Sequence, residues 1–157
     1  MSTNLGWLSH IFDRSGRTLG APMVRGMGNL IIYDDCLVFA RLTYRDAFLA
    51  SVSGNRLNDR VDLLANDQAT LSPDELIARS PRHWIVRYDD VVSVRYHAGT
   101  EERTDAEGGA TVMKVPMESF SIELLGGSTK QLWRGTSLRG PGRSLLGQAL
   151  QERLIIV

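Results

Sequence analysis

The pattern of apolar and polar positions from residue 29 to residue 42 predicts a β-hairpin. Two apolar, β-prone runs, LIIY and CLVFA, are separated by Asp34 and Asp35. Aspartate favours turns because its carboxylate can accept hydrogen bonds from nearby backbone amides. Two strand-like runs joined by such a pair are typical of a hairpin with an exposed tip.

A strand-rich pattern returns at residue 84. The runs WIVRY and VVSVRY flank Asp89 and Asp90, so this second Tyr-Asp-Asp stretch also predicts a turn between two strands. FSIEL alternates apolar and polar residues, and the GGS that follows predicts a turn into a strand over TKQLWRG. The polar segment 99–110 predicts a mobile loop. With the first hairpin and a short run at 47–52, we expect about seven strands.

The segment from about residue 53 to residue 82 carries helical signals instead. Apolar residues recur at helical spacing in RLNDRVDLLAND. Ser72 can cap a second helix, Pro73 suits its first turn, and Glu75 completes a capping box three residues after the serine. The sequence therefore predicts a helical insertion between strands.

Both ends of the chain have apolar faces at helical spacing. Near the N-terminus such a face predicts a short amphipathic helix. We place this helix in an extension, residues 1–22, that precedes a single domain over residues 23–157. The residues of this face are Trp7, Leu8, Ile11 and Phe12. At the other end, GRSLLGQALQERL (142–154) has one wide apolar stripe. A helix with such a stripe must bury it, so we expect this helix to lie on the sheet or to close a barrel.

Composition limits the class of protein without identifying one. The 157 residues, 43% hydrophobic and 23% charged, favour one globular domain. Eighteen basic residues balance eighteen acidic ones, which argues against nucleic-acid binding. Cys36 is the only cysteine, so a disulfide within the chain and a cysteine-based zinc site are excluded. Without a secretion signal or an apolar run of about 20 residues, we expect a cytoplasmic protein that forms no stable association with membranes.

The two Tyr-Asp-Asp stretches raise the question of an enzyme. Paired carboxylates, here Asp34, Asp35, Asp89 and Asp90, can hold a divalent cation or act as acid and base. Two turns between strands would require the same residues, and their sequence contexts favour this second interpretation. The three histidines lack the spacing of metal ligands, and no nucleophile motif is present. We therefore expect no catalytic residues, no metal and no cofactor, with a metal-dependent site at the Asp-Asp turns as the alternative.

Basic residues just before the last predicted helix form the strongest candidate for a binding site. They are Lys130, Arg134, Arg139 and Arg143. A helix N-terminus presents free N–H groups and a partial positive charge, and arginine can hold a phosphate or carboxylate through two hydrogen bonds. An anion or an acidic peptide could dock there. Solvated loops are also rich in glycine and arginine, so the pattern leaves both interpretations open.

The order of these elements resembles that of pleckstrin-homology-like (PH-like) domains, especially the bacterial branch. The resemblance covers roughly residues 23–154 and rests on three stretches: GNLIIYDDCLVFAR as an opening hairpin, IVRYDDVVSVRY as a later strand pair, and FSIELLGGSTKQLWR running into GRSLLGQALQERL. It implies a seven-stranded, strongly bent antiparallel barrel capped at one end by the C-terminal helix. Phosphoinositide-binding members carry basic residues around the first hairpin, whereas this hairpin has Asp34 and Asp35 at its tip.

Most domains of this kind are adaptors, so the resemblance implies a non-enzymatic module that binds a protein or peptide partner. A barrel with exposed strand edges can pair with an extended peptide, or assemble into a homo-oligomer through the same edges. The alternative is an anion or lipid-headgroup binder that uses the basic residues before the last helix. An open groove beside that helix would favour peptide recognition, and a symmetric interface would favour self-assembly.

Overall fold

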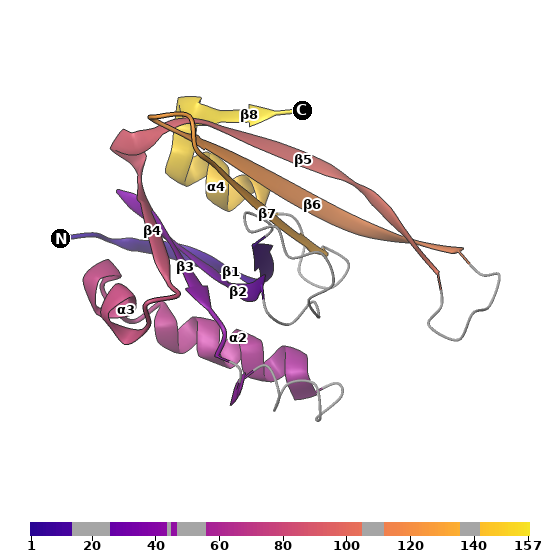
Figure 1. Cartoon of the computed structure of the whole chain (residues 1–157), viewed down its shortest axis with the longest axis horizontal. Coiled ribbons are helices and arrows are strands. Elements are labelled where there is room, and N and C mark those ends of the chain that lie inside the picture. Colours follow the sequence, from indigo (N-terminus) through magenta and orange to yellow (C-terminus); the bar gives the residue numbers. More distant parts are fainter. Residues whose placement is uncertain (14–25, 44, 47–55, 105–111, 136–141) are drawn as a thin grey trace.

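One open, mixed sheet of eight strands forms the centre of the protein. The structure, a computed structural model, describes residues 1–13, 26–43, 45–46, 56–104, 112–135 and 142–157 (Figure 1). In these residues the strand order is β4-β3-β2-β1-β7-β6-β5-β8. β8 is parallel to β5, and every other neighbouring pair is antiparallel. The chain is thus mainly β with helices, as the sequence predicts, but the described residues contain eight strands rather than about seven.

The first half of the sheet contains the predicted hairpin. Its strands are β1 (Asn4–Asp13), β2 (Met27–Tyr33), β3 (Cys36–Arg41) and β4 (Trp84–Arg87). β2 and β3 pair antiparallel around an exposed tip of Asp34 and Asp35, which confirms the hairpin. Every residue of β2 is buried, and so is every residue of β3 except Arg41, because elements cover both faces of this half. Burial on both faces explains why these runs are continuously apolar.

β1 replaces the helix that the sequence predicts near the N-terminus, so that prediction is wrong. The strand pairs with β2 on one side and β7 on the other, and it joins the two halves of the sheet. Its register with β2 shifts between Leu8 and Ile11, and His10 in this irregular stretch has a φ of 57°. The extra residue puts both Leu8 and Ile11 into the main core, where a regular strand would point them to opposite faces. A β-bulge therefore imitated helical spacing.

The predicted helical insertion is confirmed between β3 and β4. It consists of α2 (Arg56–Gln68) and α3 (Pro73–Arg79), and α3 begins with the expected capping box of Ser72 and Glu75. Leu76 of α3 packs against apolar residues of β2 and β3, and Val61 of α2 packs beside Met27 and Leu42. Both helices lie beside the β1–β4 half (Figure 1). The short strand predicted at 47–52 lies outside the described residues.

The second Tyr-Asp-Asp stretch is a corner between strands and not a hairpin. It forms the 3₁₀ turn η2 (Tyr88–Asp90), which leads from β4 into β5 (Val91–Thr104). β4 pairs with β3, whereas β5 pairs with β6 and β8, so the two strands flanking the turn are not partners. The expected strand pair is therefore wrong, although the expected turn is present.

β5 and β6 (Val112–Leu124) form the longest strand pair and extend past the rest of the sheet (Figure 1). Residues 99–104 belong to β5 and pair with β6, so this part of the predicted loop is wrong. Residues 105–111 lie outside the described residues. The predicted turn before β7 (Thr129–Gly135) is confirmed, with φ angles of 91° at Gly126 and 83° at Gly127.

α4 (Arg143–Leu150) is the predicted closing helix, and it lies between the two halves of the sheet (Figure 1). Its buried stripe of Leu146, Ala149 and Leu150 packs in one cluster with residues from both halves. The helix is shorter than expected because Gln151 adopts a φ of 49° and breaks it. The 3₁₀ turn η3 (Gln151–Arg153) and the strand β8 (Leu154–Ile156) follow.

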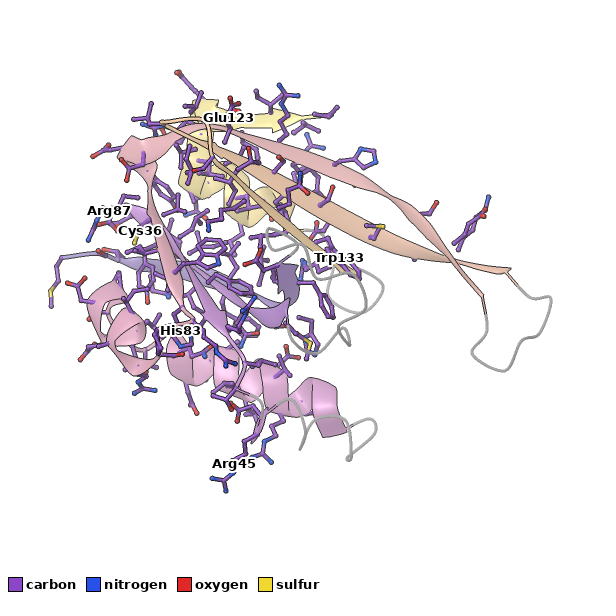
Figure 2. All side chains as sticks on the ribbon, viewed as in Figure 1. Cys36, Arg45, His83, Arg87, Glu123 and Trp133 are labelled. Atoms are coloured by element: carbon purple, nitrogen blue, oxygen red, sulfur yellow. The ribbon has the colours of Figure 1, made fainter. Side chains whose placement is uncertain are left out.

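The edge strand β4 also approaches β7, an internal strand of the second half. Nζ of Lys130 on β7 lies 5.2 Å from the ring centroid of Trp84 on β4. These strands are four positions apart in the strand order, so the sheet must curve strongly to bring them together. Within the β3–β4 pair, Cys36 is opposite Arg87 (Figure 2).

Candidate functional site

The carboxylates of the two Tyr-Asp-Asp stretches hold the N-terminal residues or face solvent. Asp34 accepts the backbone N–H of Thr3 at 2.8 Å, and Asp35 accepts the hydroxyl of Ser2 at 2.9 Å. The hydrogen bond from Thr3 lowers the pKa of Asp34. The two carboxylates of the second stretch are exposed. Within the described residues, no three His, Cys, Asp or Glu side chains are placed to hold a metal ion.

Two potential nucleophiles are enclosed in the fold. Burial raises the pKa of the Cys36 thiol to about 12. Ser9, His10 and Asp62 meet where α2 crosses β1, a cluster that sequence reasoning missed because its members are far apart in the chain. Ser9 is only 1% exposed and donates its hydroxyl directly to Asp62, whereas a catalytic triad places the histidine between serine and aspartate. This cluster fastens a helix to the sheet.

The structure separates the basic residues that the sequence singles out. Lys130 lies over the ring of Trp84 on the edge strand β4. Arg134 is 2% exposed, and its Nε donates a hydrogen bond to the buried carboxylate of Glu118. Arg143 is exposed on the first turn of α4, and Arg139 lies outside the described residues. These residues do not form a common surface in the described part of the chain.

Glu118 fixes the position of the N-terminus of α4. Its fully buried carboxylate accepts the backbone N–H of Gly142 at 2.9 and 3.0 Å and the hydroxyl of Tyr96 at 2.8 Å. The guanidinium of Arg134 balances its charge. Burial and the neighbouring carboxylate of Glu118 raise the pKa of Tyr96 to about 12. One buried carboxylate therefore ties β5, β6 and β7 to the start of α4.

An open groove of about 430 Å³ lies between α4 and β8. Its lining comes from α4, η3 and β8 and consists of Arg143, Ser144, Gly147, Gln151, Leu154 and Ile156. Gly147 keeps it wide, since a Cβ added there would meet only Leu154, at 3.8 Å. Of these residues the sequence singled out only Arg143 as a site residue, because the strand that forms the other wall was not predicted.

The edge of β8 is open next to this groove. The N–H of Val157 donates to the carbonyl of Tyr96 at 2.9 Å, and Ile156 is opposite Tyr96 in the parallel register. Successive residues of a strand point their backbone groups to opposite edges, so the N–H and C=O of Ile156 point away from β5. Within the described residues β8 ends the strand order, so these groups face an edge that no described strand pairs with.

Apolar side chains are exposed along the same edge. Ile155, Ile156 and Val157 are 45%, 50% and 70% exposed. Among the described residues seven large apolar side chains are exposed; these three are among them, and a fourth, Val92, lies on the neighbouring strand β5. Proteins usually protect a sheet edge with charged side chains, so exposed aliphatic residues there indicate an interaction surface.

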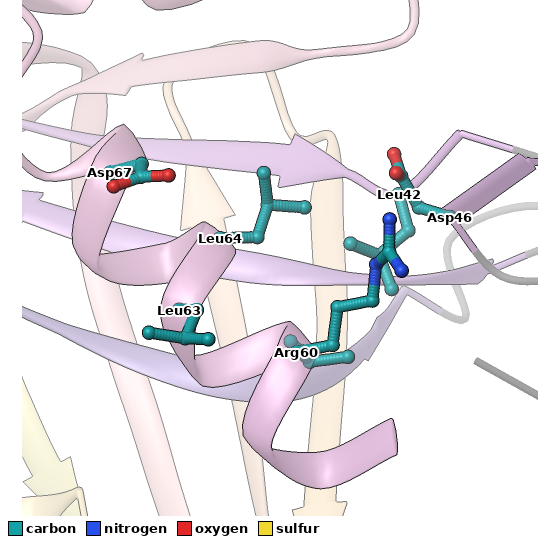
Figure 3. Close-up of a pocket in the computed structure, with 7 residues that line it drawn as sticks. Leu42, Asp46, Arg60, Leu63, Leu64 and Asp67 are labelled. Atoms are coloured by element: carbon teal, nitrogen blue, oxygen red, sulfur yellow. The ribbon is translucent and has the colours of Figure 1, made fainter. Parts of the chain in front are cut away.

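A smaller pocket of about 210 Å³ lies beside α2 (Figure 3). Apolar side chains line it together with Arg60, Asp46 and Asp67. It contains none of the sequence-predicted site residues, and its charges of both signs favour no one class of ligand. We therefore place the candidate site at the groove between α4 and β8.

Comparisons with known proteins give no further information about function. No family model, no curated protein and no solved structure matches the chain. In the part of the chain that the structure describes, no helix has both the length and the apolar character needed to cross a membrane. The function must therefore be inferred from the geometry of the groove and the edge.

Proposed function

We propose that the protein is a non-enzymatic binding module with a PH-like fold that captures an extended segment of a partner protein along β8. Two features support the PH-like fold. β1 to β4 and β5 to β7 each pair in chain order, the β1–β7 pair links them, and the closing helix follows β7. This order agrees with a bent barrel capped by its last helix, to which β8 is an addition.

The observation that carries the proposal is the groove directly beside an open strand edge. When a peptide adds to a sheet, its backbone hydrogen bonds supply affinity and pockets for alternate side chains supply specificity. The backbone groups of Ile156 would supply the hydrogen bonds, and the groove between α4 and β8 would supply a pocket for side chains. Burial of the exposed side chains on β8 would add a hydrophobic contribution.

A second copy of the chain is the competing occupant of this edge. Solution mass measured by light scattering, at low and high salt, distinguishes capture of a partner segment from pairing with a second copy. We expect a mass near 17.4 kDa under both conditions. A larger mass that resists salt would mean that β8 pairs with another copy, and the site would then be a subunit interface.

The test of strand capture is selection of random peptides by display, followed by comparison of two variants. Ile156→Pro removes the N–H that points to the open edge, while the hydrogen bond of Val157 to β5 stays. Ile156→Val keeps that N–H and serves as the matched control. Selected peptides should lose binding to Ile156→Pro and keep it with Ile156→Val, with both variants folded by circular dichroism. Peptides that bind all forms equally would exclude capture at β8.

A further inference from the structure

The groove between α4 and β8 has an uncompensated positive charge. Arg143 lines the groove, and Arg153 directly precedes β8. Both arginines are exposed, and within the described residues neither forms an ion pair. Glu152 is the only acidic side chain between residues 142 and 157. The two arginines therefore outnumber the acidic side chains beside the groove and β8.

Arg143 occupies a position that is unfavourable for the stability of α4. A cation in the first turn of a helix opposes the helix dipole, and the first turn of α4 contains no acidic residue. Glu118 does not offset this charge, because its carboxylate already pairs with Arg134. Residues that break a local rule without a structural gain are expected at functional sites.

We infer that the captured segment is acidic, with both carboxylate and apolar side chains on the face that it turns to the groove, and that Arg143 binds one of these carboxylates. The inference rests on the proposed strand capture and adds the chemistry of the partner. Alternate side chains of an added strand would face the groove, where Leu154 and Ile156 offer apolar contact and Arg143 a charge-assisted hydrogen bond.

Charge also argues against the other occupants of the site. A second copy paired through β8 would bring the arginines of both edges together, and such like charges repel. A free phosphate would use Arg143 but neither the apolar wall nor the backbone groups of Ile156. An acidic, apolar strand uses all three features.

Three synthetic octapeptides test the inference. Serine occupies every other position, and the positions between the serines alternate between valine and a variable residue, which is glutamate, glutamine or lysine. Binding is followed at low ionic strength by the shift in ¹H–¹⁵N spectra of the amide of Gly147, which lines the groove and is retained in every variant. We expect affinity to fall in the order glutamate, glutamine, lysine, with about a two- to fivefold loss from glutamate to glutamine, the range of a partly exposed ion pair. The difference should shrink in 0.5 M salt, where the screening length is short.

Arg143→Gln identifies the responsible residue. It should weaken binding of the glutamate peptide about two- to fivefold and leave the glutamine peptide unchanged. Arg82→Gln, the same change at an exposed arginine between α3 and β4, should affect neither peptide. The melting temperature of Arg143→Gln should stay the same or rise, because an unfavourable interaction with the helix dipole is removed.

The possible results separate this inference from the function on which it rests. Equal affinity for the three peptides, lost in Ile156→Pro, would leave strand capture standing and overturn the acidic partner. An unchanged affinity of Arg143→Gln for the glutamate peptide would also overturn it. Absence of binding by all three peptides at millimolar concentration would overturn both proposals.

Discussion

The hydroxyl of Tyr88 donates a 2.7 Å hydrogen bond to the carbonyl oxygen of Tyr33, which joins the two Tyr-Asp-Asp stretches of the chain. The backbone N–H of Tyr88 also donates to the carbonyl of Asp35 at 3.0 Å. Both tyrosines are buried, whereas the aspartates that follow them are exposed. The repeated tripeptide is therefore a structural junction between β2, β3 and β4, with its carboxylates turned outward.

Replacement of Tyr88 by phenylalanine should lower the free energy of unfolding by about 1–3 kcal/mol, because the buried carbonyl of Tyr33 loses its donor. Urea denaturation followed by fluorescence measures the change. Tyr33→Phe is the matched control, since its hydroxyl donates to the carbonyl of Leu71 in a partly buried place and should cost less. A larger loss in the control than in Tyr88→Phe would contradict this assignment.

Glu118→Gln should be among the most destabilising single substitutions in the chain. It leaves the guanidinium of Arg134 buried without a counter-charge, and breaking a buried pair in this way typically costs about 3–5 kcal/mol. Glu123→Gln removes a charge from the same strand at an exposed position and should cost less than about 1 kcal/mol. Denaturant midpoints of the two variants make the comparison, and similar midpoints would show that the buried carboxylate is not essential.

Two glycines should respond oppositely to the addition of one methyl group. A Cβ at Gly28 in β2 would lie 2.6 Å from the carbonyl oxygen of Ala40, so Gly28→Ala should cost about 1–3 kcal/mol. A Cβ at Gly147 in α4 meets only a leucine methyl at 3.8 Å, so Gly147→Ala should stabilise by up to about 1 kcal/mol through helix propensity. Melting temperatures should move in opposite directions, and a stable Gly28→Ala would mean that β2 and β3 can separate to accommodate it.

Local chemistry explains which elements could be predicted from the sequence. The β2–β3 hairpin and the capped start of α3 depend on neighbouring residues, namely the Asp34-Asp35 tip and the Ser72–Glu75 capping box. β1 could not be recognised, because its bulge gives an apolar spacing that periodicity alone assigns to a helix. β8 has only three residues, and its first one, Leu154, continues the apolar stripe of α4 at helical spacing.

The candidate site was less predictable than the fold, because it depends on contacts between distant residues. Arg134 and Arg143 look alike in the sequence, but one is buried against Glu118 and the other is exposed at the groove. Nothing near Arg134 in the sequence marks Glu118 as its partner, since the pairing follows from the register of β6 and β7. Likewise, Gly147 becomes a site residue only once β8 forms the opposite wall of the groove.

The buried thiol of Cys36 should make the protein less stable in alkali. Burial raises the pKa of this thiol from 9.0 to about 12, so the unfolded chain releases the proton at a lower pH than the folded protein does. The contribution of this thiol to the free energy of unfolding is therefore fully present below pH 9 and is lost progressively between pH 9 and about 12. The expected slope from this one group is about 1.4 kcal/mol per pH unit.

Urea unfolding of the wild type and of Cys36→Ala, from pH 7 to pH 11 with a reductant present, isolates this slope. The alanine variant should be less stable by a constant amount below pH 9, because the substitution leaves a small cavity in the core. Above pH 9 the difference should narrow by about 1.4 kcal/mol per pH unit, since only the wild type has a thiol to ionise on unfolding. The tyrosines cancel in this comparison, because both proteins retain them. Parallel stability curves above pH 9 would mean that the thiol of the folded protein ionises as readily as that of the unfolded chain.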